Sequence, residues 1–274
     1  MPFLDIKTAT SHIVLRTQNL NIGYRDKTEE TLIASAIDLE LYEGELTAII
    51  GINGVGKSTL LRSLSGVQEM LAGEVYINQN KLKDISPGEL AQSISVVLTE
   101  QPVSRNLTVF ELIALGRQPY TNWIGTLTQE DRQQINYALQ LVGIEDLQHK
   151  KCYELSDGQL QKVLIGRALA QDTPLVVLDE PTTHLDIYHQ AYVLKLLKNL
   201  TVKTKKSILF STHEINLALQ LCDKIILMEK GRVTIGTPTE LVEKNMFAEM
   251  FPDDLIIFDR ETRSFRINIE NGES

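Results

Sequence analysis

The sequence predicts an α/β fold built around a mostly parallel sheet. Three apolar runs have the composition of buried strands: Leu175–Leu178, Ser207–Phe210 and Lys224–Met228. A helical stretch from Gln190 to Leu200 separates the first two runs. Strands that alternate with helices and show no polar face are typical of a parallel sheet covered on both sides. A further apolar run, Leu46–Ile50, enters a glycine-rich turn and then a helical pattern, which predicts another strand–helix unit.

The remaining elements follow from local patterns. Further strands are expected over 13–24, 37–50 with a turn at 43–45, 74–77 and 95–98. A helix is expected over 57–65, and the apolar spacing between about Asn106 and Ala170 predicts a helical insert between strands. The tail reads as a small hairpin of residues 255–258 and 264–267.

The glycine-rich turn carries a phosphate-binding pattern. Residues 51–58 read G-I-N-G-V-G-K-S, with a strand before them and a helix after them, which is the expected setting of a P-loop. Its backbone N–H groups form an anion site. Lys57 supplies a positive charge opposite the β- and γ-phosphates, and the Ser58 hydroxyl is a ligand for Mg²⁺. The chain is therefore predicted to bind a nucleoside triphosphate. The expected contacts are Gly51, Asn53, Gly54, Gly56, Lys57, Ser58 and Thr59.

Two acidic residues follow another buried strand. Leu175–Leu178 leads directly into Asp179 and Glu180, which places Asp179 at the carboxyl edge of the sheet, where ligands bind. Asp179 is expected to hold Mg²⁺, directly or through water, and Glu180 to accept a proton from an attacking water. Alone, this pattern would be an ordinary acidic strand end. Beside a P-loop, it predicts a catalytic site.

A second phosphate site is predicted near the end of the helical insert. Residues 154–159 read E-L-S-D-G-Q, and Ser156 can cap the helix that runs to Ala170. A hydroxyl, backbone N–H groups and a helix dipole together favour a phosphate. One nucleotide does not need two such sites in one chain, so this stretch predicts a dimer with nucleotide at its interface. Without the P-loop, an ordinary capped helix would be the better interpretation.

Four single residues are further candidates. The carboxamide of Gln101, just past a strand, can reach Mg²⁺ or the attacking water, and His213, after the strand 207–210, can contact the γ-phosphate. Asp186 can bridge two subunits, and Tyr24 can stack on adenine. Three of them have an alternative reading, since a lone Gln is usually a surface residue and most lone His and Tyr residues only pack. The position of His213 after a core strand favours the functional reading.

The overall composition bears on the expected partners and on the cellular compartment. The net charge of −9 argues against a nucleic-acid partner, which usually leaves a basic footprint. Cys152 and Cys222 lack metal-ligand spacing and suit free thiols in a reducing compartment. No apolar stretch approaches the roughly 18 residues of a membrane span, and no secretory signal is visible, so a cytosolic chain is expected. Any work at a membrane would require docking on a partner.

From about Ile13 to Glu249 the chain resembles the ATP-binding subunits of ABC transporters, with every motif in the family's order. The matches are Gly51–Ser58 with Walker A, Leu175–Glu180 with Walker B, Leu155–Gln159 with the signature motif, Gln101 with the Q-loop, Leu185–Asp186 with the D-loop, His213 with the switch histidine and Tyr24 with the A-loop aromatic.

The resemblance implies a single domain over 1–274 that hydrolyses ATP with Mg²⁺. It implies a P-loop NTPase (RecA-like) core and an antiparallel β region over about 13–100 and 171–250, a helical subdomain over about 101–170, and a hairpin extension over about 251–274. It also implies a head-to-tail homodimer with two ATP molecules at its interface. Each ATP would be held by one subunit's P-loop and by Ser156, Gly158 and Gln159 of the other.

Two segments resemble a subfamily more closely. Leu107–Pro119, and Asp179–Ile187 with His189 and Gln190, look like the importers of iron–siderophore complexes, haem and cobalamin. This implies a peripheral subunit at the cytoplasmic face of the membrane, docked on transmembrane permease subunits and served by an extracytoplasmic binding protein. The chain departs from the pattern at Asp157, where Gly is usual, at Glu100, where Pro is usual, and at Leu160, a typically basic position.

The segment Gln101–Pro119 is expected to couple nucleotide state to the permease, with Arg105, Phe110, Arg117 and Tyr120 lining a groove for a partner helix. Phe110 and Tyr120 are equally open to a reading as core residues.

Two other function classes remain open alternatives. One is a soluble ABC-type ATPase that acts on nucleic acid or ribosomes, and the other is a regulatory nucleotide-binding protein without turnover. A single cassette, the acidic balance and the absence of a heptad block argue against the first. The presence of Glu180, Gln101 and His213 argues against the second.

Overall fold

A computed structural model describes residues 12–26, 29–98, 105–229, 231–248, 250–251 and 255–268. Its centre is a six-stranded sheet in the order β11-β10-β4-β9-β8-β7. The neighbouring pairs from β10 to β7 are parallel, and only β11 runs antiparallel to β10. The strands are β4 (Leu46–Ile50), β7 (Ile94–Val97), β8 (Leu175–Leu178), β9 (Ser207–Ser211), β10 (Lys224–Glu229) and β11 (Arg232–Gly236).

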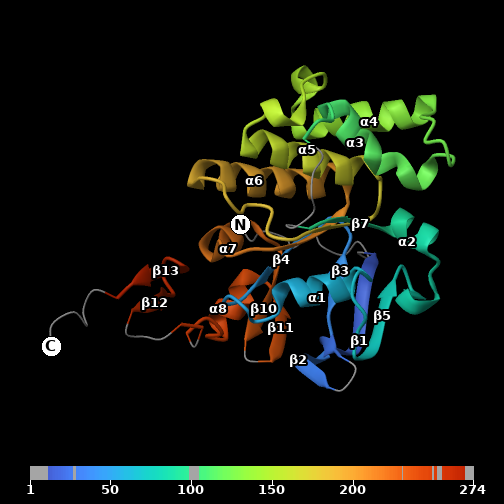
Figure 1. Cartoon of the computed structure of the whole chain (residues 1–274). Coiled ribbons are helices and arrows are strands. Elements are labelled where there is room, and N and C mark those ends of the chain that lie inside the picture. The colour runs from blue at the N-terminus through green and yellow to red at the C-terminus, as the bar shows by residue number, and fades with distance from the viewer. Residues whose placement is uncertain are drawn as a thin grey trace, which may run out of the picture.

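A second, antiparallel sheet lies on one side of this centre, below it in Figure 1. Its long strand β1 pairs with β2, β3 and β5, and β5 pairs with β6. The strands are β1 (Ile13–Arg25), β2 (Glu30–Ile37), β3 (Glu40–Tyr42), β5 (Ala72–Ile77) and β6 (Asn80–Lys81). The predicted combination of a mostly parallel sheet with an antiparallel N-terminal region is confirmed.

Helices cover both faces of the central sheet. α1 lies between the two sheets, whereas α3 to α6 stack on the opposite face, above the sheet in Figure 1. The α-helices are α1 (Lys57–Leu64), α2 (Pro87–Ser93), α3 (Val109–Ala114), α4 (Gln129–Val142), α5 (Asp157–Ala170), α6 (Ile187–Thr204), α7 (Ile215–Leu221) and α8 (Pro238–Glu243). Short 3-10 turns cover Leu82–Asp84, Leu115–Tyr120, Glu145–Leu147 and Cys152–Glu154. No helix in the described ranges is both long and apolar enough to cross a membrane.

The central strands are apolar throughout because successive side chains enter two different cores. Ile49 of β4 and Leu209 of β9 belong to the core shared with α1 and the antiparallel sheet. Their neighbours Ala48 and Phe210 belong to the core shared with the helical insert. The loops that leave these strands are therefore anchored by hydrophobic packing on both sides.

The helical insert is held together by caps and one buried ion pair. The α3, α4 and α5 helices each begin with a capping box, in which an N-cap hydroxyl and an N3 side chain exchange hydrogen bonds with the backbone. Nε of Arg117 donates to Oδ1 of Asp131 at 2.8 Å, and Nη1 donates to the carbonyl of Ala170 at 2.8 Å. These contacts join the turn after α3 to the start of α4 and the end of α5.

The C-terminal hairpin is also confirmed, as β12 (Ile256–Asp259) and β13 (Ser264–Ile267). It packs through Phe258 and Phe265 against Phe247, which is buried. The side-chain amide of Asn216 in α7 fastens its edge: Oδ1 accepts from Phe265 N at 2.9 Å, and Nδ2 donates to Phe265 O at 3.4 Å.

The prediction of strands over 37–50 was wrong at its start and missed β2. Only Ala34 and Ile37 of β2 are buried, and its pairing with β1 is irregular, so the strand lacks a clear alternation. The chain leaves the ladder at Asp38 and Leu39, where Leu39 N donates to the Thr17 hydroxyl at 3.0 Å. The strand β11 and the helices α2 and α8 were not predicted.

Candidate functional site

The candidate site lies where three neighbouring strands of the central sheet end. The P-loop follows β4, Asp179 and Glu180 follow β8, and His213 comes two residues after β9. β4 pairs with β9 and β9 with β8, all in parallel, so their carboxyl ends meet at one edge. The sheet thereby gathers residues that are far apart in the sequence, as the strand assignments predict.

The P-loop folds around its own lysine. Nζ of Lys57 donates to the carbonyl oxygens of Gly51 at 3.0 Å and Ile52 at 3.4 Å. Burial lowers the pKa of Lys57, and the carboxylates of Glu180 and Asp179 act in the opposite direction. Neutral carbonyls are weaker acceptors than phosphate oxygens. The ammonium therefore gains by exchanging these carbonyls for the oxygens of a triphosphate.

The loop needs glycine at Gly56, the N-cap of α1. Its φ of 107° lies in the region that side chains rarely adopt. A Cβ there would also lie 2.3 Å from Cγ2 of Ile33, which leaves no room for a side chain. Because Gly56 carries no side chain, the Ile33 side chain of β2 packs directly against the start of α1 and helps to fix the loop.

The acidic pair is fixed by a serine that sequence reasoning missed. The hydroxyl of Ser211, fully buried at the end of β9, donates to Oδ1 of Asp179 at 2.7 Å and accepts from Glu180 N at 2.9 Å. Ser58 donates to the same Oδ1 at 3.1 Å. A hydroxyl and a carboxylate are the hard oxygen donors that Mg²⁺ prefers, so Ser58 and Asp179 fit the metal assigned to them.

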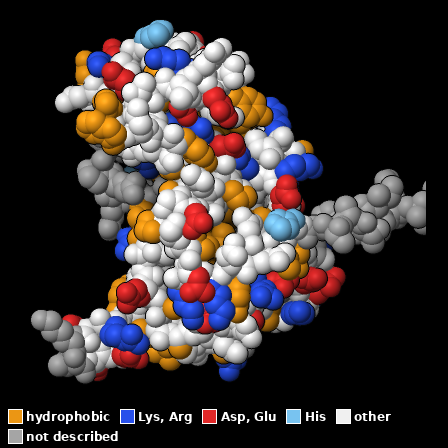
Figure 2. Space-filling view, turned by 90° about the vertical axis from the view of Figure 1, so that its right-hand side faces the viewer, with side chains coloured by type: hydrophobic (Ala, Val, Ile, Leu, Met, Phe, Trp, Pro, Cys, Tyr) orange, Lys and Arg blue, Asp and Glu red, His pale blue; other side chains and the backbone are white. Residues whose placement is uncertain are grey.

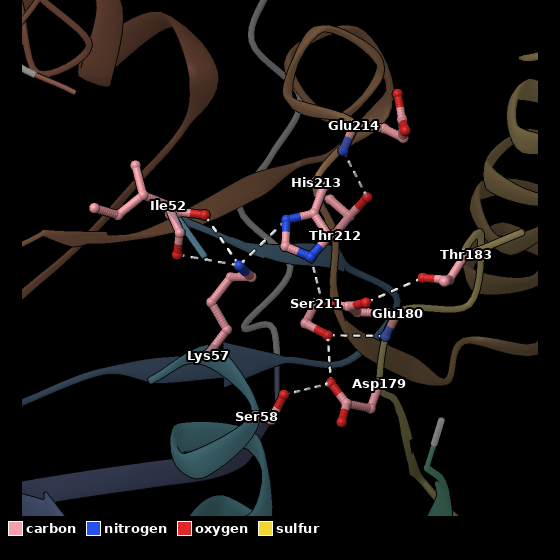
Figure 3. A network of polar contacts seen from close by, with 11 residues as sticks. Ile52, Lys57, Ser58, Asp179, Glu180, Thr183, Ser211, Thr212, His213 and Glu214 are labelled. Atoms are coloured by element: carbon pink, nitrogen blue, oxygen red, sulfur yellow. Dashed lines mark hydrogen bonds and ion pairs between the residues drawn. The ribbon is translucent and has the colours of Figure 1, made fainter. Parts of the chain in front are cut away.

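His213 links the P-loop to the acidic pair (Figure 3). Its Nδ1 lies 3.4 Å from Nζ of Lys57, and its Nε2 lies 2.5 Å from Oε1 of Glu180. An ammonium only donates, so Nδ1 accepts and Nε2 carries the proton given to Glu180. The other carboxylate oxygen, Oε2, accepts from the Thr183 hydroxyl at 3.0 Å. Both oxygens of Glu180 are thus held by the protein.

A cavity of about 460 Å³ opens above these groups. That volume lies within the range of small-molecule sites. Tyr24 stands at its wall, half exposed, and its hydroxyl lies 2.9 Å from the Thr59 hydroxyl. The cavity is lined by Tyr24, Ile33, Asn53, Gly54, Gly56, Lys57, Ser58, Thr59, Glu180 and His213.

The residues predicted to form a second phosphate site lie away from the P-loop cavity in the described chain. Ser156 caps α5, as expected, by accepting from Gln159 N at 3.3 Å. Asp186 caps α6 by accepting from His189 N at 2.9 Å. None of these residues, nor Gly158, is among those that line the P-loop cavity.

Gln101 and Glu100 lie outside the residues that the structure describes. The expectation that Arg117 lines a groove for a partner was wrong, because Arg117 is 4% exposed and its guanidinium is used by Asp131 and Ala170. Phe110 packs partly into the core, in line with its alternative reading.

Comparison with known proteins gives a consistent result. A family model described as ABC transporter matches residues 34–183. The chain is 38% identical to the uncharacterized ABC transporter ATP-binding protein MJ0873 of Methanocaldococcus jannaschii, over 87% of this chain and 81% of that protein. It is 35% identical to the iron(3+)-hydroxamate import ATP-binding protein FhuC of Bacillus subtilis, over 88% of each.

Solved structures show the same likeness. One is a metal-chelate type ABC transporter in an inward-facing conformation, with a TM-score of 0.74, 28% identity, and coverage of 93% of this chain and 95% of that one. Another is the dimeric structure of MJ0796, a bacterial ABC transporter cassette, with a TM-score of 0.70, 29% identity, and coverage of 82% and 98%.

Proposed function

The chain belongs to the ABC transporter family of ATP-binding proteins, and on that premise we propose that it hydrolyses ATP to drive import of an iron–siderophore, haem or cobalamin-type chelate. One geometric observation carries the proposal of hydrolysis: His213 joins the P-loop lysine to Glu180 at the mouth of a cavity of nucleotide size. The import assignment rests on similarity to FhuC and to the metal-chelate type transporter.

ATP binding would use the P-loop as a cradle. The N–H groups around Gly54 and Gly56 would bind the phosphates. Lys57 would exchange the carbonyls of Gly51 and Ile52 for β- and γ-phosphate oxygens. Asn53, Ser58 and Thr59 line the same cavity. The half-exposed ring of Tyr24 at the cavity wall is suited to stack on adenine.

Hydrolysis would use Glu180 as the general base. Its carboxylate is preset by His213 and Thr183, and its backbone by Ser211, so it needs only to exchange one of these partners for the attacking water. A positioned base of this kind contributes about 10²–10⁴-fold to the rate. His213 would remain near the γ-phosphate, where its ring holds the side chains of Lys57 and Glu180 in place relative to each other.

Mg²⁺ would be held by Ser58 and Asp179, with Gln101 as a further ligand assigned from the sequence alone. When bound, the ion neutralises charge on the β- and γ-phosphate oxygens. The Ser211 hydroxyl orients Oδ1 of Asp179 toward Ser58, so the two oxygen donors already lie together.

The active form would be a homodimer. Ser156, Gly158, Gln159 and Asp186 lie outside the P-loop cavity of their own chain, which supports a role at the nucleotide of a second copy. The dimeric state of the MJ0796 cassette supports the same arrangement.

Transmembrane permease subunits are the proposed docking partners, with an extracytoplasmic binding protein acting indirectly and the ATPase at the cytoplasmic face of the membrane. Exposed Arg105 and partly exposed Tyr120 are the remaining candidates for the docking groove. On the face drawn in Figure 2, acidic and basic side chains are mixed rather than gathered by sign. That surface does not favour the alternative of a nucleic-acid or ribosome-bound ATPase.

Glu180→Gln tests the proposal. The amide keeps the side-chain shape but accepts no proton, so ATP should close the dimer without being hydrolysed. Sedimentation with Mg-ATP should show a stable dimer for Glu180→Gln and not for Glu145→Gln, an exposed carboxylate changed in the same way. A monomeric Glu180→Gln chain, also with permease present, would contradict the dimer. Failure to co-purify with membrane permease subunits would contradict the importer.

A further inference from the structure

The start of α5 touches the start of α6 through the ring of His189. A Cβ placed on Gly158 would lie 2.9 Å from Cδ2 of the His189 ring and 3.5 Å from its Cγ. Real Cβ atoms essentially never approach that closely, so the glycine leaves just enough space for the ring. Gly158 therefore has a packing role within its own subunit, apart from any contact with a nucleotide.

The His189 ring is also tied to Asp186. Its Nδ1 lies 2.9 Å from both carboxylate oxygens of Asp186, and its backbone N–H donates to Oδ1 at 2.9 Å. The Tyr188 ring also packs edge-on against it, at 5.4 Å between centroids. These hydrogen bonds hold the pKa of Asp186 below its ordinary value. One histidine thus holds the D-loop aspartate on one side and abuts Gly158 on the other.

A second contact repeats the connection one helical turn further on. Nζ of Lys162 in α5 lies 4.3 Å from the ring centroid of Tyr192 in α6. Residues 158 and 162 lie on one face of α5, as 189 and 192 do on α6, because neighbours three or four apart share a helix face. Two side-chain contacts therefore align the first two turns of both helices.

We propose that His189 is a positioning residue that couples the signature motif to the D-loop of the same subunit. This inference rests on the proposed dimer, in which Ser156 and Gly158 meet the nucleotide of the second copy. A displacement of Gly158 would then be transmitted to Asp186 by the His189 ring that contacts both residues. It would not depend on movements in the hydrophobic core.

A double-mutant cycle separates this role from a nucleotide contact. In the full chain without nucleotide, Gly158→Ala should lower the unfolding midpoint, because the methyl group meets the ring. In Gly158→Ala/His189→Ala, that added loss should disappear, because the space is vacant. This arm needs no ATP, so it tests the contact whether or not the proposed function holds. If Gly158→Ala lowered the unfolding midpoint equally in the natural chain and in the His189→Ala chain, the proposal would be overturned.

ATPase kinetics test the coupling. His189→Ala should lower kcat about fivefold or more at nearly unchanged KM for ATP. His189→Asn should restore most of kcat, since its amide takes the place of Nδ1 as the donor to Asp186. His149→Ala, an exposed histidine in the helical insert, serves as control and should behave as the natural chain. Equal kcat for His189→Ala and the natural chain, or no recovery in His189→Asn, would overturn the coupling role.

Discussion

Replacing Arg117 with methionine should destabilise the chain by about 3–5 kcal/mol, because it strands a buried carboxylate. Methionine keeps the apolar stem and much of the volume but removes the guanidinium. The side chains of Arg117 and Asp131 are only 5% and 3% exposed. The loss therefore falls on groups that water reaches poorly.

The size of the loss follows from which contacts remain. Oδ2 of Asp131 keeps its bonds from the N–H and hydroxyl of Thr128, at 2.9 and 2.7 Å. Oδ1 loses its donor, which places the loss toward the lower part of the range for broken buried pairs, about 3 kcal/mol. The carbonyl of Ala170 also loses the Nη1 donor, and this unpaired acceptor raises the loss toward the upper end of the range, about 5 kcal/mol, if no water replaces it.

Urea unfolding followed by circular dichroism measures this loss. Arg132→Met, an exposed arginine beside Asp131, is the matched control and should change stability by less than about 0.5 kcal/mol. A loss below about 1 kcal/mol for Arg117→Met would refute the reasoning, since it would mean that Asp131 is neutral or solvated without its partner.

The same pair predicts a pH dependence. Burial raises the pKa of Asp131, but the Thr128 donors and Arg117 outweigh it and hold that pKa below its ordinary value of 3.8. A lowered folded-state pKa contributes stability that is complete above the unfolded value and is lost as pH falls through the folded value. The difference in stability between the natural chain and Arg117→Met should therefore shrink below about pH 4.

Three further outcomes are expected. Lys57→Ala should abolish ATP turnover and weaken ATP binding while the circular dichroism spectrum stays native; normal turnover would contradict the P-loop assignment. Asp157→Gly should raise ATPase activity if the carboxylate repels phosphate, and should lower the melting temperature slightly because α5 loses an acid from its first turn; an unchanged rate would mean that the carboxylate points away from the nucleotide. Burial raises the pKa of the thiols of Cys152 and Cys222, so iodoacetamide near pH 8 should label both only after unfolding; labelling of the native chain would disprove that burial.

The parallel core was predictable because its strands are apolar on both faces and end in functional residues. Leu175–Leu178 and Leu46–Ile50 illustrate this, since each is wholly buried. Elements at the edge carry weaker signals. The strand β2 exposes Leu32 and buries only two residues, so its pattern resembles a loop as much as a strand.

The candidate site was predictable where a motif names the residue. Lys57, Asp179, Glu180 and His213 do lie together, and Ser156 does cap its helix. Ser211 was missed because its role depends on strand register: Leu178 pairs with Phe210, which brings Asp179 beside Ser211. Pairing the ends of β8 and β9 would have pointed to it.

The docking of the C-terminal hairpin bears on solubility. The edge of a two-stranded sheet carries backbone groups that readily pair with another extended chain. Asn216 occupies both groups of Phe265 on that edge with its amide and so imitates a neighbouring strand. The same hairpin covers Phe247, which is 1% exposed. A chain shortened before β12 would uncover an aromatic surface beside the helix that follows His213, and we expect such a chain to self-associate.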